Sequence, residues 1–317
     1  MPDRRNRVHV QHFDLYLGRC LSRLRFGRQE EQNQVMSLIH SSDYSRRAFL
    51  TMAGAGVVAL GGCAVTQQEQ SRPFLLKAAL NGGRQPGSHP ALPTTADEFA
   101  NAAQNAVEAG AGAIHIHVRD SEVNESLRSE DIASVLTTVR SIIPSTPIGI
   151  STHFGIVGDA ERRQEIVSRW SVLPDFASVN FNEPGSVALA QLLIENGVGV
   201  EAGLFNADAA ATCVESGLGS DCLRFMMEPR NRVLEDALSN VAEMEAVLDA
   251  AGVDRPRLLH GFRATAWPLI EEATRRGYDT RAGLEDTFEL ADGSTARDNT
   301  EIVAEAAHAI ARISGYS

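Results

Sequence analysis

Two histidines separated by one residue, His115 and His117, lie in the short apolar run GAIHIHVRD. On a strand, residues i and i+2 point to the same face, so both imidazoles would converge on one point. Two neutral nitrogens and one carboxylate form a zinc site that leaves a fourth position for water or substrate. Glu285 and Glu228 are the candidates for the third ligand. Hydrogen-bonded structural histidines are the alternative interpretation.

The elements that must position these side chains alternate regularly from residue 74 onward. Short apolar runs are followed by longer segments with apolar residues at helical spacing. The predicted strands are FLLKAAL, AIHIHV, PIGIST, FASVNF, GVEAGLF, CLRFMME, RLLHGF and TRAGLED. Eight β-then-α units in about 240 residues predict a parallel (β/α)8 TIM barrel. An open doubly wound sheet is the alternative, but no GxGxxG follows the first strand.

The predicted helices have recognisable ends. Thr94-Thr95 and Ser129-Glu130 have the chemistry of helix N-caps. Several of the helical segments end on a glycine, which is typical of a C-cap. These glycines are Gly110, Gly197, Gly217, Gly252 and Gly277.

Polar residues gather where the predicted strands end, which is where TIM barrels place their chemistry. They are Asn81, His115, His117, Ser151, Thr152, Asn180, Glu201, Glu228, His260, Glu285 and Asp286. Buried polar groups at this density are costly unless a metal, a substrate or one another satisfies them. The single lysine of the chain, Lys77, lies within the first predicted strand, so a Schiff-base mechanism is nearly excluded.

Residues 45–63 read SRRAFLTMAGAGVVALGGC and resemble an export signal. The pair Arg46-Arg47 precedes an apolar stretch that is shorter than the ~20 residues needed to span a bilayer. The arginine pair indicates a twin-arginine signal. LGGC resembles a lipobox, in which Cys63 would carry a lipid and become the mature N-terminus. Translation from Met36 would give a leader of ordinary length.

We therefore expect three parts. Residues 1–63 form an N-terminal extension with the signal, residues 64–72 form a polar tether, and residues 73–317 form the barrel. Export by the twin-arginine route to the periplasm, with membrane attachment only through a lipid anchor, is the expected location. A cytoplasmic protein is the alternative.

Composition narrows the possible partners. The formal net charge is -12, which argues against a nucleic-acid partner because phosphates need basic residues. The four cysteines show no CxxC spacing, so neither a disulfide scaffold nor a thiolate zinc site is expected. A homo-oligomer fits a barrel with short loops, although the pattern identifies no interface.

Six segments of the barrel together resemble the beta-keto acid cleavage enzymes, a family that includes the 3-keto-5-aminohexanoate cleavage enzyme. They are LNGGRQPGSHPALP, AGAGAIHIHVRD, FASVNFNEPG, GVGVEAG, RLLHGFRATAWP and TRAGLEDT. The resemblance covers about residues 75–313. It implies a zinc-dependent TIM barrel that converts a small-molecule beta-keto acid and acetyl-CoA into acetoacetate and a new CoA thioester. The cofactors implied are Zn2+ and, as co-substrate, acetyl-CoA.

The resemblance also implies roles for individual residues. His115, His117 and Glu285 would bind zinc, which polarises the keto carbonyl. Glu201 or Asp286 would act as general base. The remaining residues of the predicted site are expected to contact substrate.

Arg281 would neutralise a substrate carboxylate or the developing charge. On a regular strand it would lie ~13 Å deeper than Glu285, so an ion pair in the barrel floor is the alternative. His153 and His260 are expected to be structural. The predicted substrate-binding residues are Ser151, Thr152, Asn180 and Asn81.

Two other functions remain open from the residues alone. The first is a zinc lyase or hydrolase that does not use CoA, and the second is a non-catalytic ligand-binding lipoprotein. An amidohydrolase fits poorly, because those barrels place their HxH on the first strand and here it lies on the second.

Overall fold

The computed structural model describes residues 74–315. In this part of the chain eight parallel strands form one sheet in the order β7-β6-β5-β4-β3-β2-β1-β8. Each predicted apolar run contains one of these strands, so the (β/α)8 barrel is confirmed. The twin-arginine signal, Cys63 and the tether lie outside the described residues.

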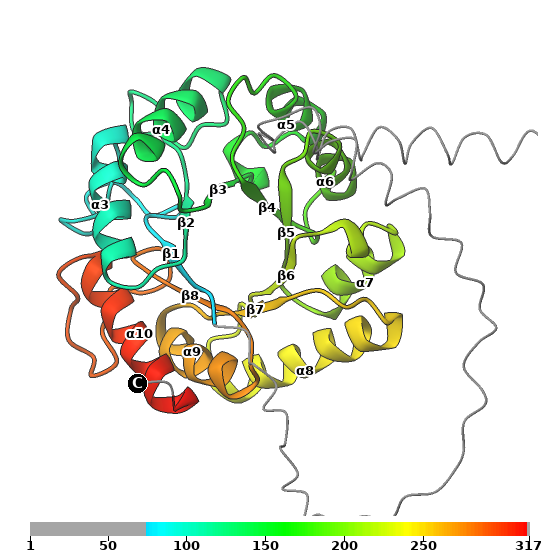
Figure 1. The fold of residues 1–317 in the computed structure, drawn as a ribbon. Coiled ribbons are helices and arrows are strands. Elements are labelled where there is room, and N and C mark those ends of the chain that lie inside the picture. The colour runs from blue at the N-terminus through cyan, green and yellow to red at the C-terminus, as the bar shows by residue number, and fades with distance from the viewer. Residues whose placement is uncertain (1–73, 316–317) are drawn as a thin grey trace, which may run out of the picture. The chain divides into compact units, whose positions relative to one another are not determined.

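The strands are short and each is followed by a helix on the outside of the ring (Figure 1). The strands are β1 (Leu76–Ala79), β2 (Ala113–Ile116), β3 (Ile148–Ser151), β4 (Phe176–Asn180), β5 (Gly199–Leu204), β6 (Arg224–Met227), β7 (Arg257–Leu259) and β8 (Thr280–Ala282). The helices are α3 (Ala96–Glu108), α4 (Ser129–Ile142), α5 (Ala160–Val167), α6 (Ser186–Glu195), α7 (Ala207–Glu215), α8 (Leu234–Ala251), α9 (Ala266–Arg275) and α10 (Asn299–Ser314).

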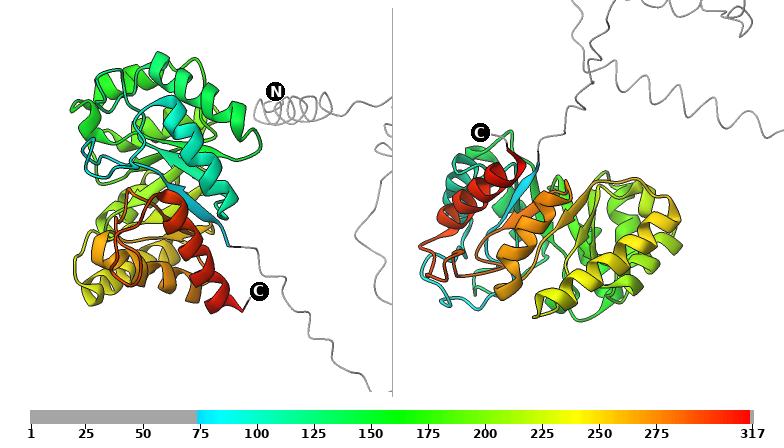
Figure 2. Two further views of the ribbon diagram at one scale, coloured as in Figure 1. Left: turned by 90° about the vertical axis from the view of Figure 1, so that its left-hand side faces the viewer. Right: turned by 90° about the horizontal axis from the view of Figure 1, so that it is seen from below.

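The last strand closes the ring from two sides. β8 pairs with β1 in parallel register, with Arg281 opposite Lys77. On its other side, the residue before β8, Asp279, bridges to β7 through its backbone. Its carbonyl accepts from the N–H of Leu259 at 2.9 Å, and its N–H donates to the carbonyl of Arg257 at 2.9 Å. Figure 2 shows α10 beside α9, so the end of the chain packs against the same part of the barrel.

The helix ends follow the sequence with one exception. Thr95 caps α3, and Glu98 bonds back to the Thr95 N–H to complete a capping box. The expected cap at Ser129 is wrong by one position, because Arg128 precedes α4 and the Ser129 hydroxyl pairs with Ser171 instead. All five predicted C-terminal glycines have positive φ, as a left-handed helix end requires.

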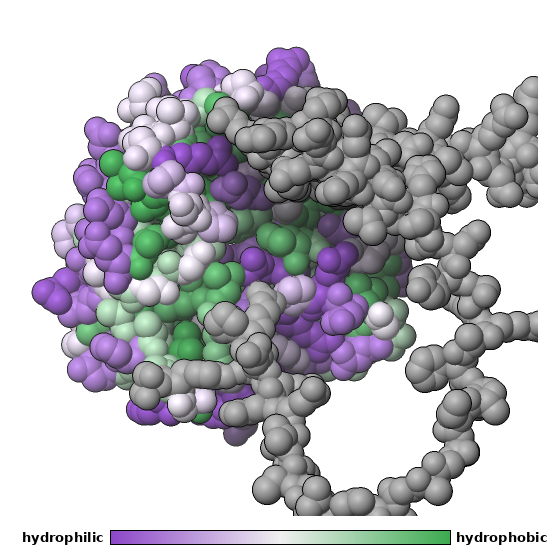
Figure 3. Space-filling view, viewed as in Figure 1, coloured by the Kyte–Doolittle hydropathy of each residue, from purple (hydrophilic) through white to green (hydrophobic). Residues whose placement is uncertain are grey.

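The outer surface agrees with a barrel surrounded by amphipathic helices. Over α3 and α4, the edge of the face shown in Figure 3 is largely hydrophilic. Among residues 74–315, no helix is long and apolar enough to cross a membrane.

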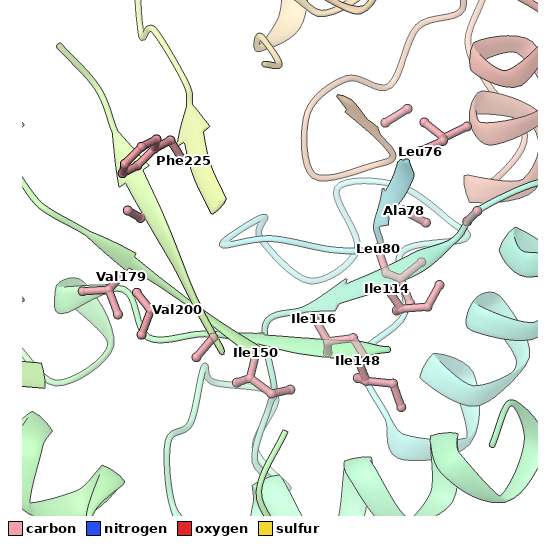
Figure 4. Close-up of a cluster of buried hydrophobic side chains, with 14 of the residues drawn as sticks. Leu76, Ala78, Leu80, Ile114, Ile116, Ile148, Ile150, Val179, Val200 and Phe225 are labelled. Atoms are coloured by element: carbon pink, nitrogen blue, oxygen red, sulfur yellow. The ribbon is translucent and has the colours of Figure 1, made fainter. Parts of the chain in front are cut away.

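Alternate residues of the strands build the core between sheet and helices. Figure 4 shows their outward-pointing apolar side chains, all of them buried. Those labelled are Leu76, Ala78, Leu80, Ile114, Ile116, Ile148, Ile150, Val179, Val200 and Phe225. Period-two alternation then sends the intervening residues into the barrel. They include His115 on β2, His117 directly after it, and Lys77 on β1.

Candidate metal centre and active site

Three predicted ligands converge at the carboxyl ends of the strands. His115 lies on β2, His117 follows it directly, and Glu285 follows β8. The Nε2 atoms of His115 and His117 lie 3.7 and 3.6 Å from the two carboxylate oxygens of Glu285. One ligand atom from each residue fits within 4.8 Å of the others. The three are the only such group of metal-binding side chains found in the described part of the chain.

Glu285 reaches this position because β8 is only three residues long. At Gly283 the chain turns away from the strand, and a Cβ atom there would lie 2.1 Å from the carbonyl oxygen of Ala79. Gly82 allows equally close packing from the opposite side, since its Cβ would lie 2.4 Å from Cγ of Glu285. Two glycines therefore let the first and last strands meet around this carboxylate.

The same turn corrects the predicted depth of Arg281. The estimate of ~13 Å below Glu285 assumed a regular strand, whereas β8 ends at Ala282. One guanidinium nitrogen of Arg281 lies 2.8 Å from Glu285 and 2.6 Å from Asp286. Arg281 thus forms an ion pair, which was the alternative interpretation. Its partners, Glu285 and Asp286, belong to the candidate site and not to the interior of the barrel below it.

His117 is held by two neighbours. Asn81 binds its backbone from both sides, accepting from the His117 N–H at 2.9 Å and donating to its carbonyl at 2.8 Å. The carboxylate of Glu125 lies 2.5 Å from Nδ1 of the ring. A carboxylate on one ring nitrogen directs the other toward a metal and increases its basicity. Glu125 was missed from the sequence, because it lies in an irregular loop after β2.

Without a metal, the two histidines differ in protonation state. Burial holds the pKa of His115 well below its ordinary value, so this imidazole is neutral. Burial opposes protonation of His117 as well, but Glu285 and Glu125 outweigh it and raise its pKa to about 9. The pKa of Glu285 is well below its usual range, because Arg281 and the histidines outweigh its burial.

This donor set fits Zn2+. Two imidazoles and a carboxylate are a usual set of three protein ligands for catalytic zinc. Oε2 of Glu285 is buried and has no hydrogen-bond partner among the described residues, and 3.7 Å separates it from Nε2 of His115. A cation between them would satisfy both groups.

Asp286 lies beside the ligands and is a candidate base. It is almost fully buried and accepts two hydrogen bonds from Arg281, at 3.1 and 2.6 Å. Burial and the neighbouring charge of Glu285 raise its pKa to about 6, against the opposing effect of Arg281. At neutral pH the carboxylate form is therefore available to accept a proton.

His260, which we expected to be structural, lies between two carboxylates. Its ring nitrogens lie 3.5 Å from Glu228 and 3.6 Å from Asp286, too far for a hydrogen bond. Burial keeps the pKa of His260 well below its ordinary value. Burial also raises the pKa of Glu228 to about 7. Glu228 contacts His260 and not the zinc-binding set, so Glu285 is the better third ligand.

Glu201 occupies a different place from the one its predicted role requires. It is fully buried, pairs directly with the ammonium group of Lys77, and lies 3.3 Å from Arg224. Lys77 is in register with Ala113, two residues before His115, so this cluster lies one inward layer below the histidines. The geometry favours an ion pair inside the barrel for Glu201 and leaves Asp286 as the candidate base.

The predicted substrate-binding residues are all buried at the strand ends. The Thr152 hydroxyl donates to the carbonyl of Ser178 at 2.7 Å, so it is committed to the neighbouring strand. The amide of Asn180 donates to Glu183 at 2.8 Å. The Ser151 hydroxyl makes one weak contact with the His153 N–H at 3.3 Å. Ser151 and Asn180 thus keep hydrogen-bonding capacity for a substrate. In Asn81, by contrast, both the oxygen and the nitrogen of the side-chain amide bind the backbone of His117.

A cavity of about 560 Å³ opens above the metal-site residues. His117, Glu125 and Glu285 form part of its wall, and His153 lies on its rim. This volume lies within the usual range for small-molecule sites, about 300–1,000 Å³.

A closed (β/α)8 barrel with its polar residues at the carboxyl ends of the strands has the architecture of an enzyme. The model of the beta-keto acid cleavage enzyme family matches residues 73–316, and the chain belongs to this family. It is therefore an enzyme of the beta-keto acid cleavage type.

Named relatives agree with this family, and a solved structure agrees with the fold. The chain is 28% identical over 251 residues to a 3-keto-5-aminohexanoate cleavage enzyme from Fusobacterium nucleatum, covering 73% of this chain and 88% of that protein. It is 31% identical over 110 residues to a 3-oxoadipate:acetyl-CoA acetyltransferase from Cupriavidus necator, covering 34% and 37% of the two chains. The fold is similar to that of ObcA in complex with oxaloacetate, with a TM-score of 0.55, 18% identity and coverage of 69% of this chain and 63% of ObcA.

Proposed function

We propose that this enzyme transfers the acyl group of a beta-keto acid to CoA in a zinc-dependent reaction. The keto acid and acetyl-CoA would be converted to acetoacetate and a new CoA thioester. The observation that carries the proposal is the convergence of His115, His117 and Glu285 beside the buried pair Arg281 and Asp286. A relative named as an acetyl-CoA acetyltransferase supports acetyl-CoA as the acceptor.

Zinc, held by His115, His117 and Glu285, would polarise the keto carbonyl and bind the substrate carboxylate. Asp286 would remove a proton from the C2 methylene of the keto acid. The resulting carbanion at C2 would attack the thioester carbonyl of acetyl-CoA and release CoA as its thiolate. The released thiolate would attack the original keto carbon and break the C2–C3 bond. Asp286 would return the proton to C2 of acetoacetate. The exchange is thereby balanced without any redox step.

Arg281 would orient the two carboxylates during this cycle. It pairs with Glu285 and Asp286 together, so it fixes the ligand and the base relative to each other. In the fully buried guanidinium, the carboxylates outweigh burial and raise the pKa above its ordinary value, so the charge is permanent. Ser151 and Asn180, which keep hydrogen-bonding capacity at the ends of β3 and β4, would contact the substrate.

The test is to incubate the zinc-loaded full chain with acetyl-CoA and a series of beta-keto acids, and to follow acetoacetate and the new CoA thioester by mass spectrometry. We expect Asp286→Asn to bind zinc but lose at least about 100-fold in rate. Asp292→Asn, on an exposed loop, is the matched control. Products that form without acetyl-CoA would instead favour a lyase or hydrolase that does not use CoA.

We also propose that the protein is exported by the twin-arginine route and anchored through Cys63. Arg46-Arg47, the apolar core and the cysteine occur in the order that such signals require. Fractionation of cells expressing the wild-type chain and an Arg46→Lys/Arg47→Lys variant tests this. Equal cytoplasmic amounts of both would favour the cytoplasmic alternative.

A further inference from the structure

The cavity above the metal-site residues is lined by more positive than negative groups. Four arginines line it against two glutamates, although the whole chain carries a net charge of -12. One of these glutamates, Glu125, is bound to His117, and the other, Glu285, is bound to Arg281. The cavity is therefore an electropositive site in an acidic protein. The arginines are Arg84, Arg230, Arg232 and Arg263.

Two of these arginines are fixed beside the site. Arg84 is half-buried, donates from Nε to the carbonyl of Glu285 at 3.0 Å, and lies with its guanidinium carbon 4.5 Å from the ring centre of Phe288. These contacts engage Nε and one face of the guanidinium, and the two terminal nitrogens have no hydrogen-bond partner within residues 74–315. Such a preorganised fork suits a carboxylate.

Arg230 approaches from the β6 side. Its guanidinium carbon lies 3.9 Å from the ring centre of Phe262 and 4.3 Å from that of Phe205. One terminal nitrogen lies 3.2 Å from Glu228. Stacking between two rings restricts the side chain, so little conformational entropy is lost when it binds an anion. Because burial raises the pKa of Glu228 to about 7, that carboxyl balances the charge of Arg230 only in part.

Arg232 and Arg263 extend the positive wall to the rim. Across residues 74–315, no carboxylate lies within ion-pair distance of either guanidinium. Arg263 has a φ of 53°, which is unfavourable for a residue with a side chain, and its N–H donates to the carbonyl of Asp286 at 2.8 Å. Strained residues are retained where the surrounding structure requires their position.

We infer that the keto acid cleaved here carries a second anionic group, a carboxylate at the end remote from the reacting carbonyl, and that Arg84 and Arg230 bind it. The inference rests on the proposed function for the reacting end of the molecule. A phosphate of CoA offers the same charge. The keto acid is favoured for the inner pair because Arg84 and Arg230 contact Glu285 and Glu228, which lie at the strand ends and not at the rim.

A matched pair of substrates tests the inference, because 3-oxoadipate and 3-oxohexanoate differ only in a carboxylate replacing a methyl group. With the zinc-loaded full chain, we expect kcat/KM to be about 10- to 100-fold higher for 3-oxoadipate, the range for a hydrogen-bonded charge. Arg84→Gln and Arg230→Gln should each reduce this ratio about tenfold, and Arg230→Lys should reduce it less. Arg312→Gln, an exposed charge on α10, should leave the ratio unchanged.

A binding measurement separates this inference from the proposed function. Calorimetry with glutarate and butyrate requires no turnover, and we expect glutarate to bind about tenfold more tightly through Arg84 and Arg230.

If both keto acids are cleaved equally well, the inference is wrong and the function stands. If neither is cleaved but glutarate binding depends on both arginines, the anion site stands and the function is wrong. If the variants weaken CoA binding but keep the substrate ratio, the arginines bind phosphate and the inference is overturned.

Discussion

The carboxylate of Glu125 lies 2.5 Å from Nδ1 of His117, so the Nε2 atom of the same ring faces Glu285. This contact determines which nitrogen is available to a metal. It also raises the pKa of the ring, because a negative group adjacent to imidazole favours its charged form. One residue in a loop thus controls both the orientation and the proton affinity of a candidate ligand.

Replacing Glu125 with Gln should weaken zinc binding about 10- to 100-fold, the usual cost of losing a residue that orients a ligand. Competition with a chromogenic chelator measures the change. Glu122→Gln is the matched control, since Glu122 is exposed in the same loop and only its backbone N–H forms a hydrogen bond there. Equal affinities in the wild type and Glu125→Gln would argue against this role.

Zinc affinity should fall about tenfold for each pH unit below about 9. The metal-free protein protonates His117 with a pKa of about 9, and that proton must leave before the ring can bind a metal. His115 adds no such dependence near neutral pH because its pKa is well below the ordinary value. Titrations in buffered zinc between pH 7 and 9 should therefore show a slope of one proton. A slope of two would mean that a second ligand is also protonated.

Glu228→Gln should stabilise the metal-free protein at pH 8 but not at pH 4.5. Burial raises the pKa of this carboxyl from 4.5 to about 7, so the folded protein favours its protonated form. The stability that the protonated carboxyl contributes is fully present below pH 4.5 and is lost as the pH rises through about 7. The gain in free energy of unfolding is up to about 3 kcal/mol. Urea denaturation in EDTA at both pH values measures it. Glu243→Gln, on the exposed side of α8, should show no such difference.

Lys77→Met should destabilise the barrel by about 3–5 kcal/mol, because it leaves Glu201 buried without its main partner. The double variant Lys77→Met/Glu201→Leu should recover much of this loss, since Arg224 keeps Asp279 at 3.1 Å. Denaturation of the two single variants and the double variant gives the coupling energy. If Glu201→Gln keeps its stability but loses activity, Glu201 is the base after all.

Much of the fold could be predicted because an apolar run followed by a helical segment repeats eight times along the chain, and five of these segments end on a glycine. The same alternation placed His115 and His117 on one face. It could not give the depth of Arg281, because the length of a strand depends on where its backbone pairing ends. β8 ends at Ala282, and this turn brings the arginine to both carboxylates.

The residues missed from the sequence come from loops and from facing strands. Glu125 reaches His117 because the loop folds back on itself, with an isolated bridge between Arg119 and Glu125. No local pattern in that loop signals the contact. The pairing of Lys77 with Glu201 joins strands far apart in the sequence, so the resemblance suggested Glu201 as a base without showing its partner.

The candidate metal ligands come from β2 and from the turn after β8, and β1 lies between these two strands. An ion bound there would connect β2 to the turn after β8 and so link the beginning and the end of the barrel, where β1 pairs with β8. The coordination sphere cannot be assembled until the final strand has docked, so metal uptake would mark the completion of folding. Chains that stop before that strand would lack a ligand and would have no metal to hold their ends together.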